Sequence, residues 1–207
     1  MAKIIEFKTR GLRAELREAQ QNHTMVRLWR GALEHGSFCG YVGGVGREFI
    51  LLWVVGDGLT DDGIYVMRHS DITELEAPEA HHVFMAKALA LKGIAPDLPS
   101  SFPLDSIREA VAAAGAMATV IGVYVDSEEA GEVCYIGRLE RIEDDGFFLQ
   151  ELSPDAEWMR EPSFFAWDEV STLCVGDGYA QSLLAVAGPA PALLPGGDTG
   201  IGRAPSP

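Results

Sequence analysis

The sequence has few cysteines and no long apolar run. Three cysteines, Cys39, Cys134 and Cys174, are an odd number and lie far apart in a chain of 207 residues. This spacing argues against a disulfide framework and favours reduced, buried thiols in the cytoplasm. The longest apolar run, Phe49 to Val55, is far shorter than the roughly 20 residues that span a bilayer. The first residues also have no apolar segment of a signal peptide, so we expect a cytoplasmic protein without a membrane anchor.

Positive charge is also scarce. The chain has 16 Lys and Arg against 31 Asp and Glu, which gives a net charge of −15. Proteins that follow a phosphate backbone normally carry excess positive charge, so the composition argues against general nucleic-acid binding. The first thirty residues differ, because they hold seven of the basic residues and only three of the acidic ones. Five arginines there are candidates for a surface that faces RNA or another partner: Arg10, Arg13, Arg17, Arg27 and Arg30. The alternative is a solvated face that pairs with the protein's own carboxylates.

Motifs for catalysis and phosphate binding are missing. The glycine-rich stretch 40–46 lacks the Lys-Ser/Thr pair of a phosphate-binding loop and is followed by an apolar strand pattern. None of the five histidines has zinc-ligand spacing, and adjacent His81 and His82 would point about 100° apart on a helix, so we expect exposed or capping histidines. A catalytic cysteine needs a base held close to it, and the sequence alone indicates none. We therefore expect no cofactor and no catalytic residue.

One acidic loop is a weak candidate for a metal site. Residues 56–63 contain Asp57, Asp61 and Asp62, and hard cations prefer carboxylate oxygens. The alternating ligands and the later bidentate Glu of an EF-hand are absent, so a turn rich in Asp and Gly is the interpretation we favour. An enzyme that uses a divalent metal at this loop is one alternative function.

The composition is that of a globular protein, with 47% hydrophobic and 23% charged residues. In the first half, helical periodicity over 11–22 precedes five short segments with strand character, followed by a helix over 80–93. The expected strands are 24–33, 38–45, 49–55, 64–68 and 73–76. Short strands joined by tight turns after one helix predict a small curled barrel. Three glycines inside the second strand indicate a bend or a bulge.

The second half repeats this order. Residues 94–103 contain three prolines and read as a linker, and residues 188–207, rich in proline and glycine, read as a disordered tail. Between them we expect two helices, over 104–114 and 177–187, and strands at 118–125, 132–142, 146–151, 163–166 and 171–175. An ungapped shift of 97 places residues 40–76 on 137–173 and aligns Gly40 with Gly137 together with several apolar positions. We interpret this as an internal duplication; the alternative is two unrelated halves of one α+β domain.

The glycine-containing FCGYVGGV at 38–45, the apolar FILLWVV at 49–55, a fourth strand, a tight turn and a short fifth strand resemble an Sm-like barrel, of the SH3-like group. The resemblance covers most of residues 10–76 and, less clearly, 104–175. It implies a mainly β fold of two tandem five-stranded barrels with flanking helices, in residues 1–93 and 104–187. It also implies assembly through barrel edges, as a homo-oligomer or with a protein partner.

RNA-binding members of that family carry an Asp and an Asn between strands 2 and 3, and a basic or glycine-containing motif between strands 4 and 5. The corresponding turns here, at 46–48, 143–145, 69–71 and 167–169, match neither pattern, so no RNA-binding residue is carried over. The leading hypothesis is a non-catalytic cytoplasmic interaction or scaffold protein. RNA binding through the basic N-terminal helix is the other alternative function.

Overall fold

The computed structural model describes residues 2–31, 33, 36–78, 80–127 and 131–192; the side chains of residues 2–10, 80, 126, 127, 131 and 132 are not part of that description. The first half consists of a helix, five strands with a 3-10 turn at His69–Asp71, and a second helix. These elements are α1 (Ala2–Gln21), β1 (Met25–Trp29), β2 (Ser37–Val45), β3 (Phe49–Gly56), β4 (Thr60–Arg68), β5 (Glu74–Glu76) and α2 (Ala80–Leu91).

The second half has the same order of elements. They are α3 (Ile107–Met117), β6 (Ile121–Ser127), β7 (Gly131–Ile142), β8 (Gly146–Glu151), β9 (Ser163–Ala166), β10 (Val170–Val175) and α4 (Gly178–Ala187). The element types and most bounds agree with the expectation from sequence. None of the described helices combines the length and apolar composition that crossing a bilayer requires.

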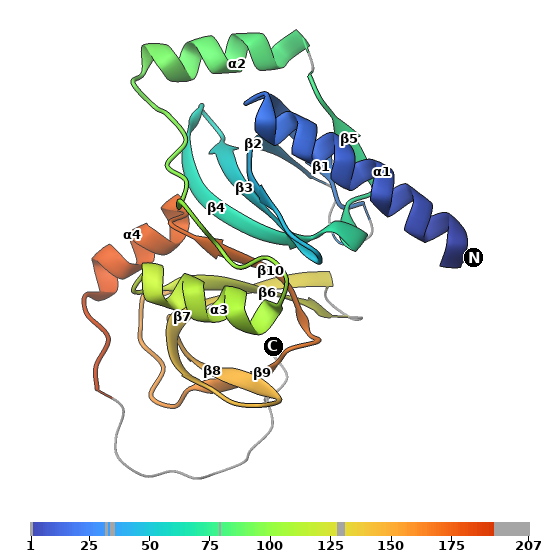
Figure 1. Ribbon diagram of the computed structural model, residues 1–207. Helices are drawn as coiled ribbons and strands as arrows, with labels where there is room; N and C mark the ends of the chain where they lie inside the picture. Colours follow the sequence, from blue (N-terminus) through green and yellow to red (C-terminus); the bar gives the residue numbers. More distant parts are fainter. Residues whose placement is uncertain (1, 32, 34–35, 79, 128–130, 193–207) are drawn as a thin grey trace.

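The ten strands of the described residues form one antiparallel sheet in the order β5-β1-β2-β3-β4-β10-β6-β7-β8-β9. The mainly β class is therefore confirmed, with the strands of both halves in a single continuous sheet. Strands β4 and β10 join the halves, with Val66 opposite Leu173 and Tyr65 opposite Cys174. The two halves curl separately and lie one above the other in Figure 1, with α1 against the first and α3 against the second.

The strand register repeats between the halves. Strand order within the first half is β5-β1-β2-β3-β4, and the second half has β10-β6-β7-β8-β9, which are the corresponding elements. In the β2–β3 pair, Gly40 lies opposite Val54, and in the β7–β8 pair Gly137 lies opposite Glu151. Each residue of the second pair is 97 positions after its counterpart. A register shift interrupts both pairs, after Val42 in β2 and after Leu139 in β7, which are again 97 residues apart.

Strand β3 is buried on both of its faces, which explains its unbroken apolar sequence. Alternate residues such as Ile50 and Leu52 join a core with Leu16 of α1. The residues between them, such as Leu51 and Trp53, join a second core with α3 and the strands of the second half. The face of the first half that points away from α1 is thus covered by α3 and by strands of the second half.

The expected linker, 94–103, is docked on the first half. The backbone carbonyl of Leu104 accepts hydrogen bonds from the N–H groups of Phe49, at 3.0 Å, and of Glu48. The glycines of β2 make room for this segment, because a Cβ at Gly44 would lie 2.7 Å from Leu104, and one at Gly43 2.4 Å from Leu98. The bulge that the glycines predict is present between Val42 and Gly44. The glycines therefore serve close packing as well as strand curvature.

Residues 193–207, most of the expected tail, lie outside the described residues. The part that is described is packed against the second half. Trp158 donates its indole N–H to the carbonyl of Gly188 at 3.1 Å, and Arg138 donates to the carbonyl of Pro191.

Candidate functional site

The acidic loop joins the two halves. Asp62 lies in β4, and its Oδ1 accepts a hydrogen bond from the N–H of Gly178, the first residue of α4, at 3.3 Å. Asp177 is the N-cap of the same helix and accepts from the N–H of Ala180 at 2.8 Å. Asp61 accepts from the N–H of Gly63 at 2.8 Å. Two of the candidate carboxylates therefore bind backbone N–H groups, and one of these groups belongs to the N-terminus of a helix in the other half.

The carboxylates of this loop influence one another. Burial raises the pKa of Asp62, and the negative charges of Asp177, Asp61 and Asp57 add to this, against the lowering effect of the Gly178 hydrogen bond. Within the part of the chain that the structure describes, no group of three or more His, Cys, Asp and Glu side chains is arranged to hold a metal ion. The contacts of Asp61 and Asp62 are those of turn and cap residues.

The five candidate arginines occupy different environments. The side chain of Arg10 lies outside the described residues. Arg13, on α1, donates to the carbonyl of Gly46 at 3.0 Å, and Arg17 is exposed on the same helix. The guanidinium of Arg27 lies over the ring of Trp29, 5.9 Å from its centroid.

Arg30 is fully buried. Its guanidinium lies over the ring of Phe38 at 5.1 Å and donates a hydrogen bond to the Thr172 hydroxyl of β10. Because Thr172 belongs to β10 of the second half, this buried cation links the residue after β1 to the other half of the chain. It is not part of a surface that could face RNA.

Arg13 and Arg17 come together at His69. This histidine follows β4 and is 4% exposed. Burial and the nearby charges of Arg13 and Arg17 lower the pKa of His69 to about 4. Its side chain is therefore neutral at pH 7. The expectation that the histidines are exposed or capping is wrong for His69, and also for His82, which is 3% exposed.

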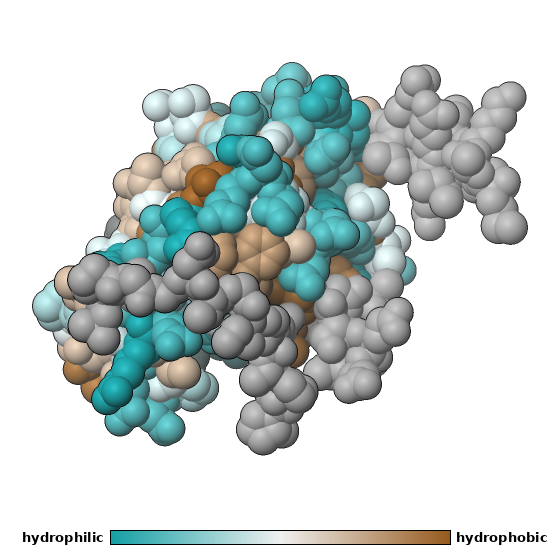
Figure 2. All heavy atoms as spheres, turned by 90° about the horizontal axis from the view of Figure 1, so that it is seen from below, coloured by the Kyte–Doolittle hydropathy of each residue, from teal (hydrophilic) through white to brown (hydrophobic). Residues whose placement is uncertain are grey.

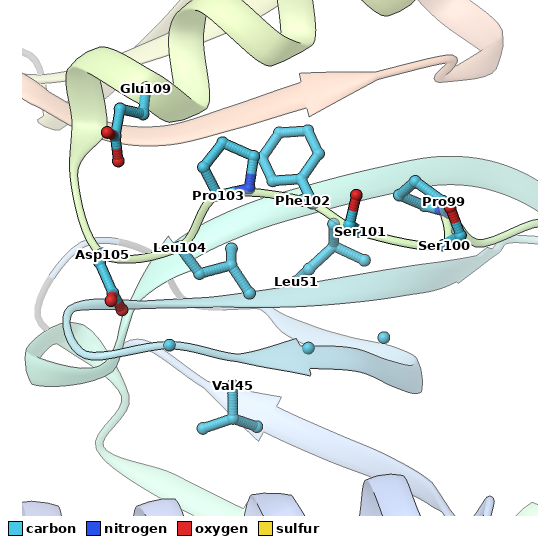
Figure 3. Close-up of a pocket in the computed structure, with 13 residues that line it drawn as sticks. Val45, Leu51, Pro99, Ser100, Ser101, Phe102, Pro103, Leu104, Asp105 and Glu109 are labelled. Atoms are coloured by element: carbon cyan, nitrogen blue, oxygen red, sulfur yellow. The ribbon is translucent and has the colours of Figure 1, made fainter.

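A groove of about 400 Å³ runs between β2 and the docked linker. Its floor is the backbone of the glycine-rich stretch 43–46 and the side chain of Leu51, and its other wall is the segment 99–105. Figure 3 shows Phe102 and Pro103 above Leu51, with the carboxylates of Asp105 and Glu109 at one end. The groove is formed by packing of the linker and contains no side-chain pair suited to acid–base or nucleophilic chemistry among its lining residues.

A second cavity, of about 460 Å³, lies where β2, β3 and β4 meet the acidic loop. Its wall includes Cys39, Asp57 and Asp62. The Sγ of Cys39 lies 3.3 Å from Nε2 of His82 on α2 and 3.8 Å from the sulfur of Met85. A thiol beside an imidazole is a nucleophile with a base, the pair that the sequence does not indicate because its members are 43 residues apart.

None of the three cysteines is in a disulfide, and they differ in exposure. Cys39 is half-buried, Cys134 is exposed and Cys174 is buried, so the expectation of three buried thiols is correct for Cys174 alone. The pKa of Cys174 is raised, first by its hydrogen bond with Cys134 and then by burial and by Asp177. This thiol is therefore protonated and enclosed.

No protein-family model, no curated protein and no solved structure matches the chain.

Proposed function

We propose that the chain is a non-catalytic interaction protein built from two tandem Sm-like barrels, and that it assembles with further copies of itself edge to edge. The first barrel corresponds to residues 1–93 and the second to 104–187. The single observation that carries this proposal is the β4–β10 pair. It joins two halves of equal strand order and leaves β5 and β9, the counterparts of β10 and β4, at the two ends of the sheet.

The internal junction specifies a register for the proposed contact. Strands β5 and β10 correspond with a shift of 98 residues, because both Leu75 and Leu173 lie opposite the equivalent residues of β1 and β6. Strands β4 and β9 correspond with the same shift. Because Leu173 pairs with Val66 inside the chain, Leu75 of one copy pairs with Phe164 of the next. A head-to-tail contact of this kind leaves a free β5 and a free β9 at its ends and can be repeated.

The outer face of the second half supports the same contact. Phe164 is 37% exposed and its ring lies 5.2 Å from that of Phe148. The corresponding residues of the first half, Val66 and Leu51, are 1% and 2% exposed, because the docked linker and the second half cover them. Figure 2 shows the end of the molecule that carries β8 and β9, where apolar residues gather near the centre of a hydrophilic face. A further copy would cover this apolar area as the second half covers the first.

The charges at β5 select its partner strand. Glu74 and Glu76 flank Leu75 and are exposed, so they disfavour pairing with another acidic strand. In the proposed register the residues opposite them are Phe165 and Ser163, which carry no charge. Acidic residues at a short edge strand are a common protection against unspecific pairing, and here they would restrict β5 to an uncharged edge. The three cysteines are thiols rather than disulfides, which fits a reducing compartment and supports a cytoplasmic location.

Light scattering after size exclusion, over a range of concentrations, tests the proposal. The wild type is expected to show a mass above that of one chain that rises with concentration. Phe164→Glu places a carboxylate opposite Leu75, which two glutamates flank, and is expected to prevent β9 from pairing with the β5 of another copy. Leu75→Glu is expected to prevent β5 from pairing with the β9 of another copy. An equimolar mixture of the two variants retains one intact edge of each kind and is expected to form a dimer and nothing larger.

Val186→Glu is the matched control, because Val186 is 79% exposed on α4 and lies outside both edges. It is expected to leave the mass distribution of the wild type unchanged. Circular dichroism establishes that each variant is folded. A wild type that remains a monomer at every concentration, or a mixture of the two edge variants that remains monomeric, contradicts the proposal.

A further inference from the structure

We propose that Cys39 and His82 form a reactive thiol–imidazole pair, which is oxidised by hydroperoxides that enter the cavity between β2, β3 and β4. This inference concerns a modification site and is independent of the proposed assembly. It rests on the distance of 3.3 Å between Sγ of Cys39 and Nε2 of His82, and on the position of Cys39 in the wall of the cavity. A cysteine is reactive when a base or a cation stands beside it and a reagent can reach it, and both conditions are met here.

The fold holds the imidazole in place. His82 is 3% exposed and lies on α2, one turn before Met85, which is 6% exposed and belongs to the core between α2 and the sheet. Its neighbour His81 points to solvent, as adjacent residues of a helix do. Because Cys39 lies on β2, the thiol and the base come from two rigid elements rather than from a loop. This arrangement keeps the base within reach of the thiol.

The groups around Cys39 carry charges of both signs. Arg27 of β1 lies directly opposite Cys39 in the strand register, which places their Cβ atoms about 5 Å apart. Tyr41, two residues along β2, lies close enough that its raised pKa, due mainly to burial, has a smaller contribution from Cys39. The other titratable groups that face this region are His82 on α2, Asp57 and Asp62 in the cavity wall, and Glu76 of β5, which lies opposite Arg27.

These charges indicate the kind of reagent. The arginine and the imidazole stabilise a thiolate. The carboxylates of Asp57 and Asp62, which line the cavity, repel anions. An uncharged electrophile is therefore favoured over an anionic one such as a glutathione disulfide. The volume of about 460 Å³ accommodates hydrogen peroxide and also a small organic hydroperoxide.

The proposed oxidation consumes one hydroperoxide for each thiol and needs no further oxidant or reductant. Nε2 of His82 accepts the thiol proton, and the sulfur of Cys39 then attacks the terminal oxygen of the hydroperoxide, which carries the hydrogen. The S–O bond forms while the O–O bond breaks, so that cysteine is oxidised to a sulfenic acid and the hydroperoxide is reduced. The leaving hydroxide or alkoxide takes the proton from the imidazolium and departs as water or alcohol. The oxidation is reversible, because one thiol converts the sulfenic acid to a disulfide with loss of water and a second thiol reduces that disulfide.

The alkylation rate of each cysteine with iodoacetamide, followed by mass spectrometry in the full-length folded protein, tests the pair. The three cysteines fall in different tryptic peptides, so each rate is measured in the same sample. At pH 6 Cys39 is expected to react at least about tenfold faster than free N-acetylcysteine. Cys174, which is buried, is expected to be protected until the protein unfolds.

Two variants of adjacent histidines separate the effect of the base from that of folding. His82→Gln is expected to lower the rate at Cys39 to that of N-acetylcysteine, whereas His81→Gln is expected to leave it unchanged. If His82→Gln does not fold, the wild-type comparison with N-acetylcysteine still decides. Dimedone labelling after treatment with hydrogen peroxide is expected at Cys39, and Cys39→Ser is expected to abolish it. A rate at Cys39 no higher than that of N-acetylcysteine, or dimedone labelling at Cys134 instead, overturns the proposal.

Discussion

Gly40 and Gly137 occupy corresponding places in the two halves of the sheet. A Cβ at Gly40 would lie 1.9 Å from the carbonyl oxygen of Trp53, and a Cβ at Gly137 would lie 2.3 Å from that of Gln150. In both halves the obstructing carbonyl comes 13 residues after the glycine, from the next strand. The backbones approach so closely because the second and third strands of each half are sharply curved. These two glycines are therefore required by the fold itself.

Alanine at either glycine is expected to destabilise the protein by about 1–3 kcal/mol, since the obstructing atoms belong to backbone and the strands must separate. Chemical denaturation of Gly40→Ala and Gly137→Ala measures this. Gly36→Ala is the control, because nothing lies within 4 Å of the added methyl group. It is expected to change the free energy of unfolding by less than about 0.5 kcal/mol. If only one of the two core glycines were sensitive, the corresponding roles of Gly40 and Gly137 would be refuted.

The match between these glycines is one part of the structure that could be predicted from sequence. Alternation, turn residues and helical periodicity are local signals, and they predicted the order of elements in both halves, including β8 and β9 at their observed bounds. They do not specify which edge of one half meets the other. The β4–β10 pair joins residues more than 100 positions apart, and β10 has the same apolar character as any buried strand. Local sequence signals therefore could not predict that the two halves form one continuous sheet.

The candidate site was less predictable than the fold. The sequence singled out Asp57, Asp61 and Asp62 because they are neighbours in the chain, and Asp62 caps a helix of the other half. It missed Cys39 and His82 because a strand residue and a helix residue carry no shared pattern when 43 positions separate them. One local signal was available: α2 has apolar residues all round, so a histidine at an inward position of that helix is enclosed.

Docking of the linker on β2 and β3 predicts a difference between two leucines. Leu104 is 8% exposed and fills the space left by Gly44 and Gly46, whereas Leu91 at the end of α2 is 90% exposed. Leu104→Ala is expected to lower the free energy of unfolding by about 2–4 kcal/mol through the cavity that it leaves. Leu91→Ala is expected to have no measurable effect. Urea denaturation compares the two variants, and equal stabilities would mean that the linker is not docked in solution.

The stability of the protein is expected to fall as the pH decreases from about 6.5 towards 4. Burial and the charges of Arg13 and Arg17 lower the pKa of His69 to about 4, whereas an unfolded histidine titrates near 6.5. Between these values the unfolded state binds a proton that the folded state does not bind, so acid favours unfolding. Thermal melting between pH 7 and 5 measures the effect, which is expected to be of the order of a few degrees.

Two histidine variants isolate the part due to His69. His69→Gln is expected to reduce the loss of melting temperature between pH 7 and 5, because the titrating group is gone. His81→Gln replaces an exposed histidine and is expected to retain the full loss. Asp62 does not interfere with this comparison, since its raised pKa acts equally in both variants and with the opposite sign. Identical pH profiles for the two variants would assign the pH dependence to other groups.

Because of the buried contact between Arg30 and Thr172, the Thr172 hydroxyl is expected to contribute more to the free energy of unfolding than an exposed hydroxyl does. Thr172 is fully buried and accepts a hydrogen bond from a guanidinium that has no access to water. Thr172→Val keeps the shape of the side chain and removes the acceptor, and hydrogen bonds to charged groups contribute about 1.5–3 kcal/mol. Thr60→Val removes an exposed hydroxyl whose partner is the neutral carbonyl of Asp57, at 3.3 Å, and is expected to cost less than about 0.5 kcal/mol.

A double-mutant cycle with Arg30→Met measures the coupling directly, because Arg30→Met removes the buried charge and makes the loss of the Thr172 hydroxyl nearly neutral. If Thr172→Val were equally destabilising with and without Arg30, the contact between the halves would not depend on this pair.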